Sequence, residues 1–181
     1  MKEITFFGRG GQGAVVASEI LANAYFHEGY NVQCFPSFGV ERRGAPVTAF
    51  LRVDEGFIYL RSMIYRADFG LVLAPDIVNA PTFKPSLKDK STILVNAKEK
   101  PSQLSEFNLS YVDATGIALE YNLGSKAQPL VNTSILGAFA KICCDLKLDN
   151  LLRAVEEKVP MKTRQNLKAV TKAYESVVSG E

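Results

Sequence analysis

A glycine-rich turn close to the start of the chain constrains the fold more than any other feature. Residues 8–13 read Gly-Arg-Gly-Gly-Gln-Gly, which fits the pattern G-x-G-x-x-G. The turn follows Ile-Thr-Phe-Phe at 4–7, a β-favouring run, and precedes residues 14–28, where apolar side chains recur at helical spacing. A strand, a glycine turn and a helix in this order form the context that a phosphate-binding turn requires.

Each glycine of the pattern has its own physical reason. Gly8 allows a tight turn at the end of the strand, Gly10 lets a phosphate approach the backbone, and Gly13 lets helix and strand pack closely. The free N–H groups and positive dipole end of the helix point into the turn, so its natural occupant is an anion. Arg9 adds a fixed positive charge there. The expected ligand-contacting residues are Gly8, Arg9, Gly10, Gly11, Gln12 and Gly13, with the backbone N–H groups of the last four as donors.

The identity of the ligand stays open at this point. A nicotinamide dinucleotide site usually carries an acidic residue about 20 positions after the turn, at the end of the second strand. Residues 33–37 read Gln-Cys-Phe-Pro-Ser, and the nearest carboxylate, Glu41, falls in the following loop. Three interpretations remain: a dinucleotide site, a site for another phosphate-bearing ligand, and a structural turn that binds nothing.

A second unusual stretch lies at residues 35–46, which read Phe-Pro-Ser-Phe-Gly-Val-Glu-Arg-Arg-Gly-Ala-Pro. Two prolines and two glycines frame a loop with charged side chains and exposed aromatics. One interpretation is a solvated loop with an ion pair between its glutamate and an arginine, of little energetic value at a surface. The other places the arginines beside the glycine turn, facing an anionic ligand or a partner protein. The candidate residues of this loop are Phe38, Glu41, Arg42 and Arg43.

Length and composition narrow the class of protein. A chain of 181 residues suits one well-buried domain spanning 1–181. Its net charge of +2, with both signs mixed along the chain, argues against nucleic-acid binding. Without a signal peptide or an apolar run near 18 residues, we expect a soluble, cytoplasmic protein with no membrane contact. Cys34, Cys143 and Cys144 lack the spacing of a zinc or iron–sulfur site, so we expect small core residues and no metal.

The remaining pattern predicts an α/β fold, a Rossmann-like three-layer domain with a mostly parallel sheet, a β-hairpin and a helical C-terminal third. Residues 84–90 are expected to form a surface connection. The strands are expected at 31–35, 69–74, 92–96 and 109–112, the hairpin at 47–53 and 57–60, and the later helices after Asn132, after Asp149 and over 163–179.

Three blocks together resemble a known family. The glycine turn at 8–13, the loop at 35–46 and Asn-Thr-Ser-Ile-Leu-Gly-Ala at 132–138 are similar to the gamma subunit of 2-oxoacid:ferredoxin oxidoreductases. The resemblance extends through essentially the whole chain. A glycine turn alone is weakly specific, whereas the second block in the right order after it is specific.

The resemblance implies a subunit of a complex that converts a 2-oxoacid and coenzyme A to acyl-CoA, carbon dioxide and reduced ferredoxin. In this family thiamine diphosphate belongs to the alpha and beta subunits and the iron–sulfur clusters to the beta and delta subunits. The gamma domain packs against alpha and is linked to coenzyme A binding. The expected partners are therefore alpha, beta and delta, with ferredoxin reached through the complex and no catalytic residue in this chain. The form of the 38–46 loop resembles the pyruvate and branched-chain members, and pyruvate ranks first.

The competing class is a free-standing phosphate- or nucleotide-binding module or enzyme with a Rossmann-like fold. Such an enzyme would need a nucleophile, an acid/base pair or a metal cluster near the turn. The sequence offers only Glu41 and isolated hydroxyl groups there.

Overall fold

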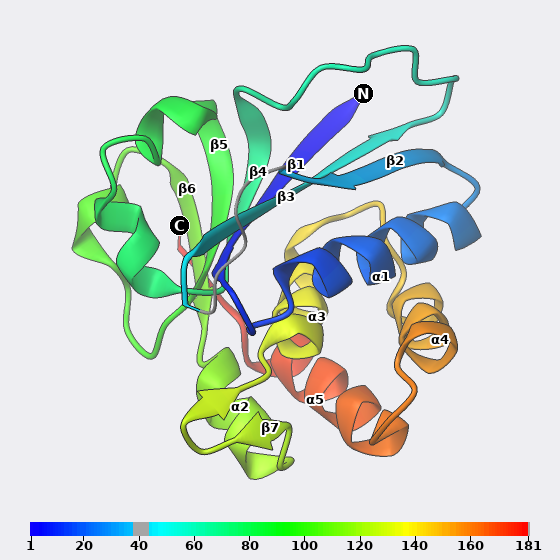
Figure 1. Cartoon of the computed structure of the whole chain (residues 1–181), viewed down its shortest axis with the longest axis vertical. Coiled ribbons are helices and arrows are strands. Elements are labelled where there is room, and N and C mark those ends of the chain that lie inside the picture. The colour runs from blue at the N-terminus through cyan, green and yellow to red at the C-terminus, as the bar shows by residue number, and fades with distance from the viewer. Residues whose placement is uncertain (38–43, 181) are drawn as a thin grey trace.

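The computed structural model describes residues 1–37 and 44–180. In these residues seven strands form one mixed sheet in the order β2-β3-β1-β4-β5-β6-β9 (Figure 1). The contacts β1–β4, β4–β5 and β5–β6 are parallel, whereas β3 and β9 run against their neighbours. The expected α/β fold with a mostly parallel sheet is confirmed. The strands are β1 (Lys2–Arg9), β2 (Asn31–Pro36), β3 (Pro46–Asp54), β4 (Ala67–Val72), β5 (Leu87–Asn96), β6 (Asn108–Val112) and β9 (Val178–Ser179).

Helices cover one face of the sheet (Figure 1). Alternation along β1 sends Ile4 and Phe6 to this face, where both are fully buried against α1. Helices α3 and α5 approach so closely that a Cβ on Gly137 would lie 2.8 Å from the carbonyl carbon of Val170. The helices are α1 (Ala14–His27), α2 (Ala114–Glu120), α3 (Asn132–Ile142), α4 (Leu148–Lys158) and α5 (Thr163–Ser176).

The opposite face carries a second apolar core under 3₁₀ segments rather than α-helices. Phe7 of β1 and Phe83 meet there edge to face, with ring centroids 4.9 Å apart. In the part of the chain that the structure describes, the third layer thus consists of short turns and loops. The 3₁₀ segments are η1 (Pro75–Asn79), η2 (Lys84–Ser86) and η3 (Ser102–Leu104).

The predicted β-hairpin is wrong. Residues 46–54 form β3, which pairs with β1 on one side and with β2 on the other. Residues 49–53 are all buried, so this strand belongs inside the sheet rather than in an edge hairpin. The N–H of Gly56 donates to Asp54 Oδ1 and makes the expected turn, but residues 57–60 form no strand. Strands β1 and β2 are parallel, as expected, but β3 lies between them.

Two boundaries and two short elements also differ from the sequence expectation. Residues 87–90, predicted to be a surface connection, begin β5. The last helix ends at Ser176, because Val178 then pairs with Tyr111 of β6. Helix α2 was absent from the prediction, and so was the small hairpin of β7 (Gly124–Ser125) and β8 (Gln128–Pro129). Two-residue strands and a seven-residue helix carry too little periodicity to be predicted.

Candidate functional site

The glycine turn lies where β1 ends and α1 begins, at the carboxyl edge of the parallel strands. Ligands of open α/β sheets bind at this edge. The start of η1 and the β7–β8 hairpin contribute side chains to the same region. The described ends of the 35–46 loop also lie there, and the N–H of Gly44 donates to the carbonyl of Gly10 at 3.3 Å. The structure therefore brings together four separate stretches of sequence, of which the turn and the loop were predicted as candidates and η1 and the hairpin were not.

Internal hydrogen bonds occupy part of the turn's backbone. The N–H of Gly10 donates to the carbonyl of Ala45 at 2.9 Å, and the N–H of Gln12 donates to the carbonyl of Arg9 at 3.0 Å. These two N–H groups are therefore not open to a ligand, which corrects the expectation of four backbone donors. Among the described residues, the N–H groups of Gly11 and Gly13 have no acceptor.

The glycines also serve different contacts from those expected. Gly11 and Gly13 have φ values of 97° and 79°, a left-handed backbone that favours glycine. A Cβ on Gly11 would collide with the amide of Gln128, and one on Gly13 would lie 2.8 Å from Asn132 Nδ2. Gly13 thus accommodates the start of α3 and not the strand. The close approach of strand and helix occurs at Gly8, where a Cβ would lie 3.1 Å from that of Ala14.

Arg9 is turned toward an aspartate that was not among the residues predicted from the sequence. Its Nε donates to Asp76 Oδ2 at 3.0 Å, its Nη2 donates to the same carboxylate, and its Nη1 donates to the carbonyl of Gly44 at 2.9 Å. The hydrogen bond from Arg9 lowers the pKa of Asp76. Any anion at the turn must therefore compete with Asp76 for Arg9. The only sequence signal for Asp76 is its place after the buried strand and Pro75.

Two clefts meet at Arg9. The smaller, of about 420 Å³, is lined by the turn and by the β7–β8 hairpin, including Ser125 and Gln128. Its described lining contains no carboxylate and offers the guanidinium of Arg9 together with amide and hydroxyl groups; Gly11 and Gly13 are not part of this lining. The larger, of about 570 Å³, lies over β1 and β3 and has an apolar floor that includes Phe7 and Phe50. The polar cleft suits an anion, and the apolar cleft does not.

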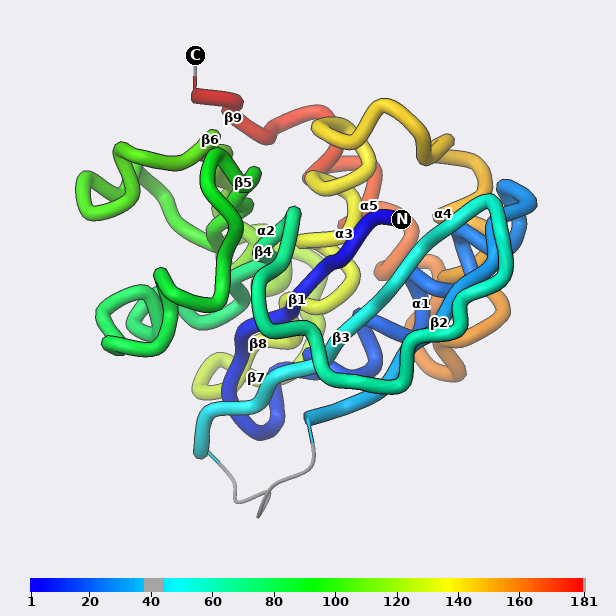
Figure 2. Tube along the Cα trace, turned by 90° about the horizontal axis from the view of Figure 1, so that it is seen from above, coloured from blue at the N-terminus to red at the C-terminus, as the bar shows by residue number. Residues whose placement is uncertain are grey.

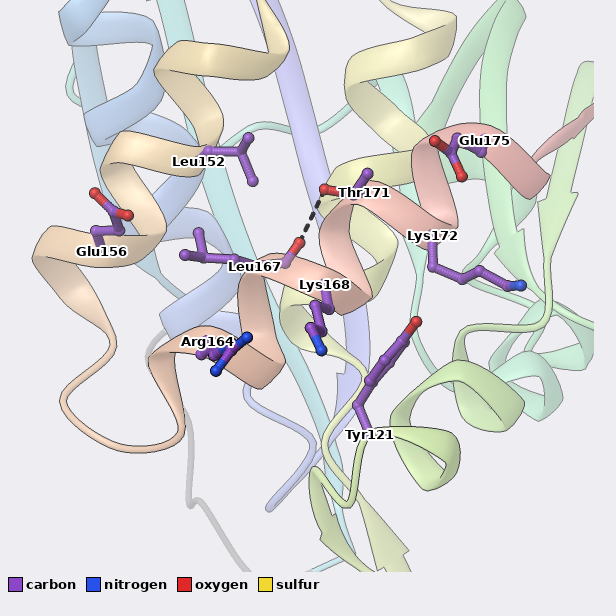
Figure 3. Close-up of a pocket in the computed structure, with 9 residues that line it drawn as sticks. All are labelled: Tyr121, Leu152, Glu156, Arg164, Leu167, Lys168, Thr171, Lys172 and Glu175. Atoms are coloured by element: carbon purple, nitrogen blue, oxygen red, sulfur yellow. Dashed lines mark hydrogen bonds between the residues drawn. The ribbon is translucent and has the colours of Figure 1, made fainter.

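A third hollow, of about 510 Å³, lies between α2, α4 and α5 (Figure 3). Three cations on α5 and two glutamates are among the residues that line it. None of the site residues predicted from the sequence is among the residues that line this hollow. Its lining is Tyr121, Leu152, Glu156, Arg164, Leu167, Lys168, Thr171, Lys172 and Glu175.

The cysteines differ from one another. Cys143 is buried, its thiol donates to Asp145 Oδ1 at 2.7 Å, and burial raises its pKa. Lys2 Nζ donates to the same carboxylate oxygen at 2.6 Å, so the cluster fastens the start of β1 to the segment after α3. Cys34 is half-buried and Cys144 is exposed, so the expectation of core residues is wrong for Cys144. Among the described residues no group of three His, Cys, Asp or Glu side chains could hold a metal ion.

Phe38, Glu41, Arg42 and Arg43, the candidates of the second block, lie outside the described residues. Within the described ranges, no helix is long and apolar enough to cross a membrane.

The chain is similar to several known proteins over nearly its full length. The family described as pyruvate ferredoxin/flavodoxin oxidoreductase matches residues 3–176. The pyruvate/ketoisovalerate oxidoreductases common subunit gamma of Thermococcus kodakarensis is 44% identical over 98% of both chains. Pyruvate synthase subunit PorC of Methanothermobacter thermautotrophicus is 44% identical, over 98% of this chain and 96% of its own. The crystal structure of pyruvate oxidoreductase subunit PORC from Thermotoga maritima is 29% identical, with a TM-score of 0.82 over 99% of this chain and 98% of its own.

The fold and the glycine turn define an α/β chain of the kind that serves as a subunit in 2-oxoacid oxidoreductases. The family match covers well over half of the sequence, and the relatives align from end to end. The chain belongs to the pyruvate ferredoxin/flavodoxin oxidoreductase family, as a gamma-type subunit.

Proposed function

We propose that this chain is the gamma subunit of a cytoplasmic pyruvate:ferredoxin oxidoreductase that also contains alpha, beta and delta subunits. The complex converts pyruvate and coenzyme A to acetyl-CoA and carbon dioxide while ferredoxin is reduced. The observation that carries the proposal is the end-to-end 44% identity to a pyruvate synthase subunit. The relative from Thermococcus kodakarensis is named as common to pyruvate and ketoisovalerate oxidoreductases, so a branched-chain 2-oxoacid is the second candidate substrate.

In this proposal the carbanion and electron-transfer steps take place on other subunits. Thiamine diphosphate, which stabilises the carbanion formed on decarboxylation, and the iron–sulfur clusters are held there. The gamma subunit binds and orients coenzyme A and helps the complex to assemble.

We propose further that the phosphates of coenzyme A bind in the polar cleft beside the glycine turn. The donor set fits a phosphate, because Arg9, the amide of Gln12 and the hydroxyl of Ser125 line the cleft. The N–H groups of Gly11 and Gly13, on the same turn, have no acceptor among the described residues. The N-terminus of α1 adds its positive dipole end. Arg9 is the charged donor, and Asp76 is the competitor that a phosphate must replace.

Steady-state titrations of coenzyme A and of pyruvate on the assembled complex test this site. Arg9→Ala should raise the apparent coenzyme A requirement on the order of tenfold, as expected for one charge-assisted hydrogen bond, with the pyruvate requirement unchanged. Asp76→Asn should act in the opposite direction, because it frees Arg9. Arg66→Ala is the matched control, since Arg66 is also exposed and also pairs with an aspartate, Asp89 at 2.8 Å.

An unaltered coenzyme A requirement in Arg9→Ala would leave the turn a structural connection between β1 and α1. Equal changes in Arg9→Ala and Arg66→Ala would attribute the effect to general surface charge rather than to this site.

A further inference from the structure

The connection between β3 and β4 exposes an unusual number of large apolar side chains. Five of them lie within residues 57–65, here named the aromatic loop. Phe57, Tyr59 and Tyr65 are 65%, 81% and 70% exposed. Single exposed apolar residues are common on soluble proteins, but a contiguous group marks an interaction site. The five side chains are Phe57, Tyr59, Leu60, Met63 and Tyr65.

A fully buried arginine holds this loop in place. Arg52 of β3 is 1% exposed, and its Nη1 and Nη2 donate to the carbonyls of Ser62 and Met63 at 2.9 and 3.2 Å. Its Nε donates to Glu3 at 3.1 Å, and its Nη1 also donates to Gln33 at 2.9 Å. The guanidinium thus joins the loop backbone to β1 and β2 from within the protein.

Further anchors fix the loop and the turn that precedes it. Gln33 Nε2 donates to the carbonyl of Leu60 at 2.8 Å, and Asn31 Nδ2 donates to that of Glu55 at 3.0 Å. Ile58 and Ile64 point inward and are buried. The loop therefore runs alongside β2 and crosses β3 on its way to β4 (Figure 2). Because its backbone is already ordered, binding a partner costs little further conformational entropy.

We infer that the aromatic loop is a docking surface for another subunit of the oxidoreductase complex. The inference rests on the proposed function, which supplies a partner chain. Met63 and Ile64 also line the apolar cleft of about 570 Å³, so the apolar surface of the loop continues into this cleft. Aromatic residues and methionine are the types enriched at the centres of protein interfaces.

The charges of the loop specify the partner's chemistry. Arg66, directly after the loop, pairs with Asp89, whereas Arg61 within the loop makes no ion pair with any described residue. The fitting partner surface is apolar, with a carboxylate opposite Arg61. A twofold contact between two copies of this loop would instead bring two cationic Arg61 side chains to one patch, which disfavours self-association.

Assembly of the co-expressed complex tests the surface. The triple variant Phe57→Ser, Tyr59→Ser, Tyr65→Ser should bind the remaining subunits on the order of a hundredfold more weakly, since interface centres carry most of the binding energy. The double variant Phe26→Ser, Met161→Ser is the matched control, because these apolar side chains are 65% and 75% exposed elsewhere. It should assemble like the parent. Arg61→Glu should also weaken assembly, most strongly at low salt.

A photo-crosslinking residue in place of Tyr59 supplies a second readout on the intact complex. It should link this chain to one other subunit. Undiminished assembly of a folded triple variant, or a crosslink only to a second copy of this chain, would overturn the inference. If the parent chain assembles and supports pyruvate oxidation while the triple variant does so equally well, the proposed function stands and the docking surface alone falls.

Discussion

Replacing Arg52 by alanine tests whether the aromatic loop is fixed from inside the protein. The side chain is 1% exposed and donates four hydrogen bonds, two to side chains of β1 and β2 and two to carbonyls of the loop. The substitution removes all four and leaves a cavity. Breaking a buried ion pair by removing one partner costs about 3–5 kcal/mol.

Two features of the structure put the expected loss of stability in Arg52→Ala near the lower end of that range. Glu3 does not lose its only cation, because Lys88 Nζ also lies 3.3 Å from its carboxylate. Ser62 and Met63 are exposed, so water can reach their carbonyls once the guanidinium is gone. We therefore expect a loss of about 3 kcal/mol in the free energy of unfolding, which lowers the melting temperature by roughly 10 °C in a chain of this size.

Urea unfolding followed by circular dichroism measures this loss, with Arg66→Ala as the control. Arg66 also donates to a backbone carbonyl and a carboxylate, but at the surface, where such a pair contributes about 0–1 kcal/mol. Hydrogen exchange should show faster exchange at residues 57–65 in Arg52→Ala and not in Arg66→Ala. A loss below about 1 kcal/mol, equal to that of the control, would refute the reasoning from the buried network.

Two further predictions concern packing and pH. Gly137→Ala should destabilise the protein by about 1–3 kcal/mol despite the better helix propensity of alanine, because the added Cβ meets the backbone of Val170. Gly56→Ala should change the unfolding midpoint little, because its Cβ would meet Asp54 Oδ1 at 3.5 Å, an ordinary contact distance. Equal midpoints in the two variants would contradict the packing argument. Burial alone would raise the pKa of Asp145, but hydrogen bonds from Cys143 and Lys2 lower this pKa below its ordinary value. The ionised carboxylate therefore stabilises the fold above the ordinary pKa, and this contribution is lost as pH falls through the folded pKa. Asp145→Asn should accordingly be less stable than the parent at neutral pH and should lose less stability between about pH 5 and pH 3. If the free energy of unfolding in urea depends on pH in the same way for variant and parent, the Lys2–Cys143–Asp145 cluster contributes nothing.

Elements with a long, regular sequence pattern were predictable, whereas short elements and contacts between residues distant in the sequence were not. The turn at 8–13 and helix α1 follow from glycine spacing and apolar periodicity. Insertion of β3 between β1 and β2 depends on the pairing of distant residues, such as Phe6 with Ala49, which no local pattern encodes. The burial of Arg52 could not be predicted either. A charged side chain is buried only when it is paired, and the partners of Arg52 come from three other segments of the chain.

The position of the glycine turn in the fold was predictable, but its contacts were not. The position of the turn follows from the strand–turn–helix order. The pairing of Arg9 with Asp76 could not be inferred, because the two residues are brought together by the neighbouring parallel strands β1 and β4. The contacts of Gln128 with Gly11 and of Asn132 with Gly13 depend on how the β7–β8 hairpin and α3 pack.

The most direct test of the account is the activity and mass of this chain with and without its partners. Tagged and purified from cells that express the whole complex, it should elute with other subunits at a mass far above its own 19.9 kDa. That complex should reduce ferredoxin only when both pyruvate and coenzyme A are present. The isolated chain, supplied with thiamine diphosphate, coenzyme A and ferredoxin, should oxidise no 2-oxoacid. Elution as a free chain from such cells, or turnover by the isolated chain above background, would contradict its assignment as a non-catalytic gamma subunit.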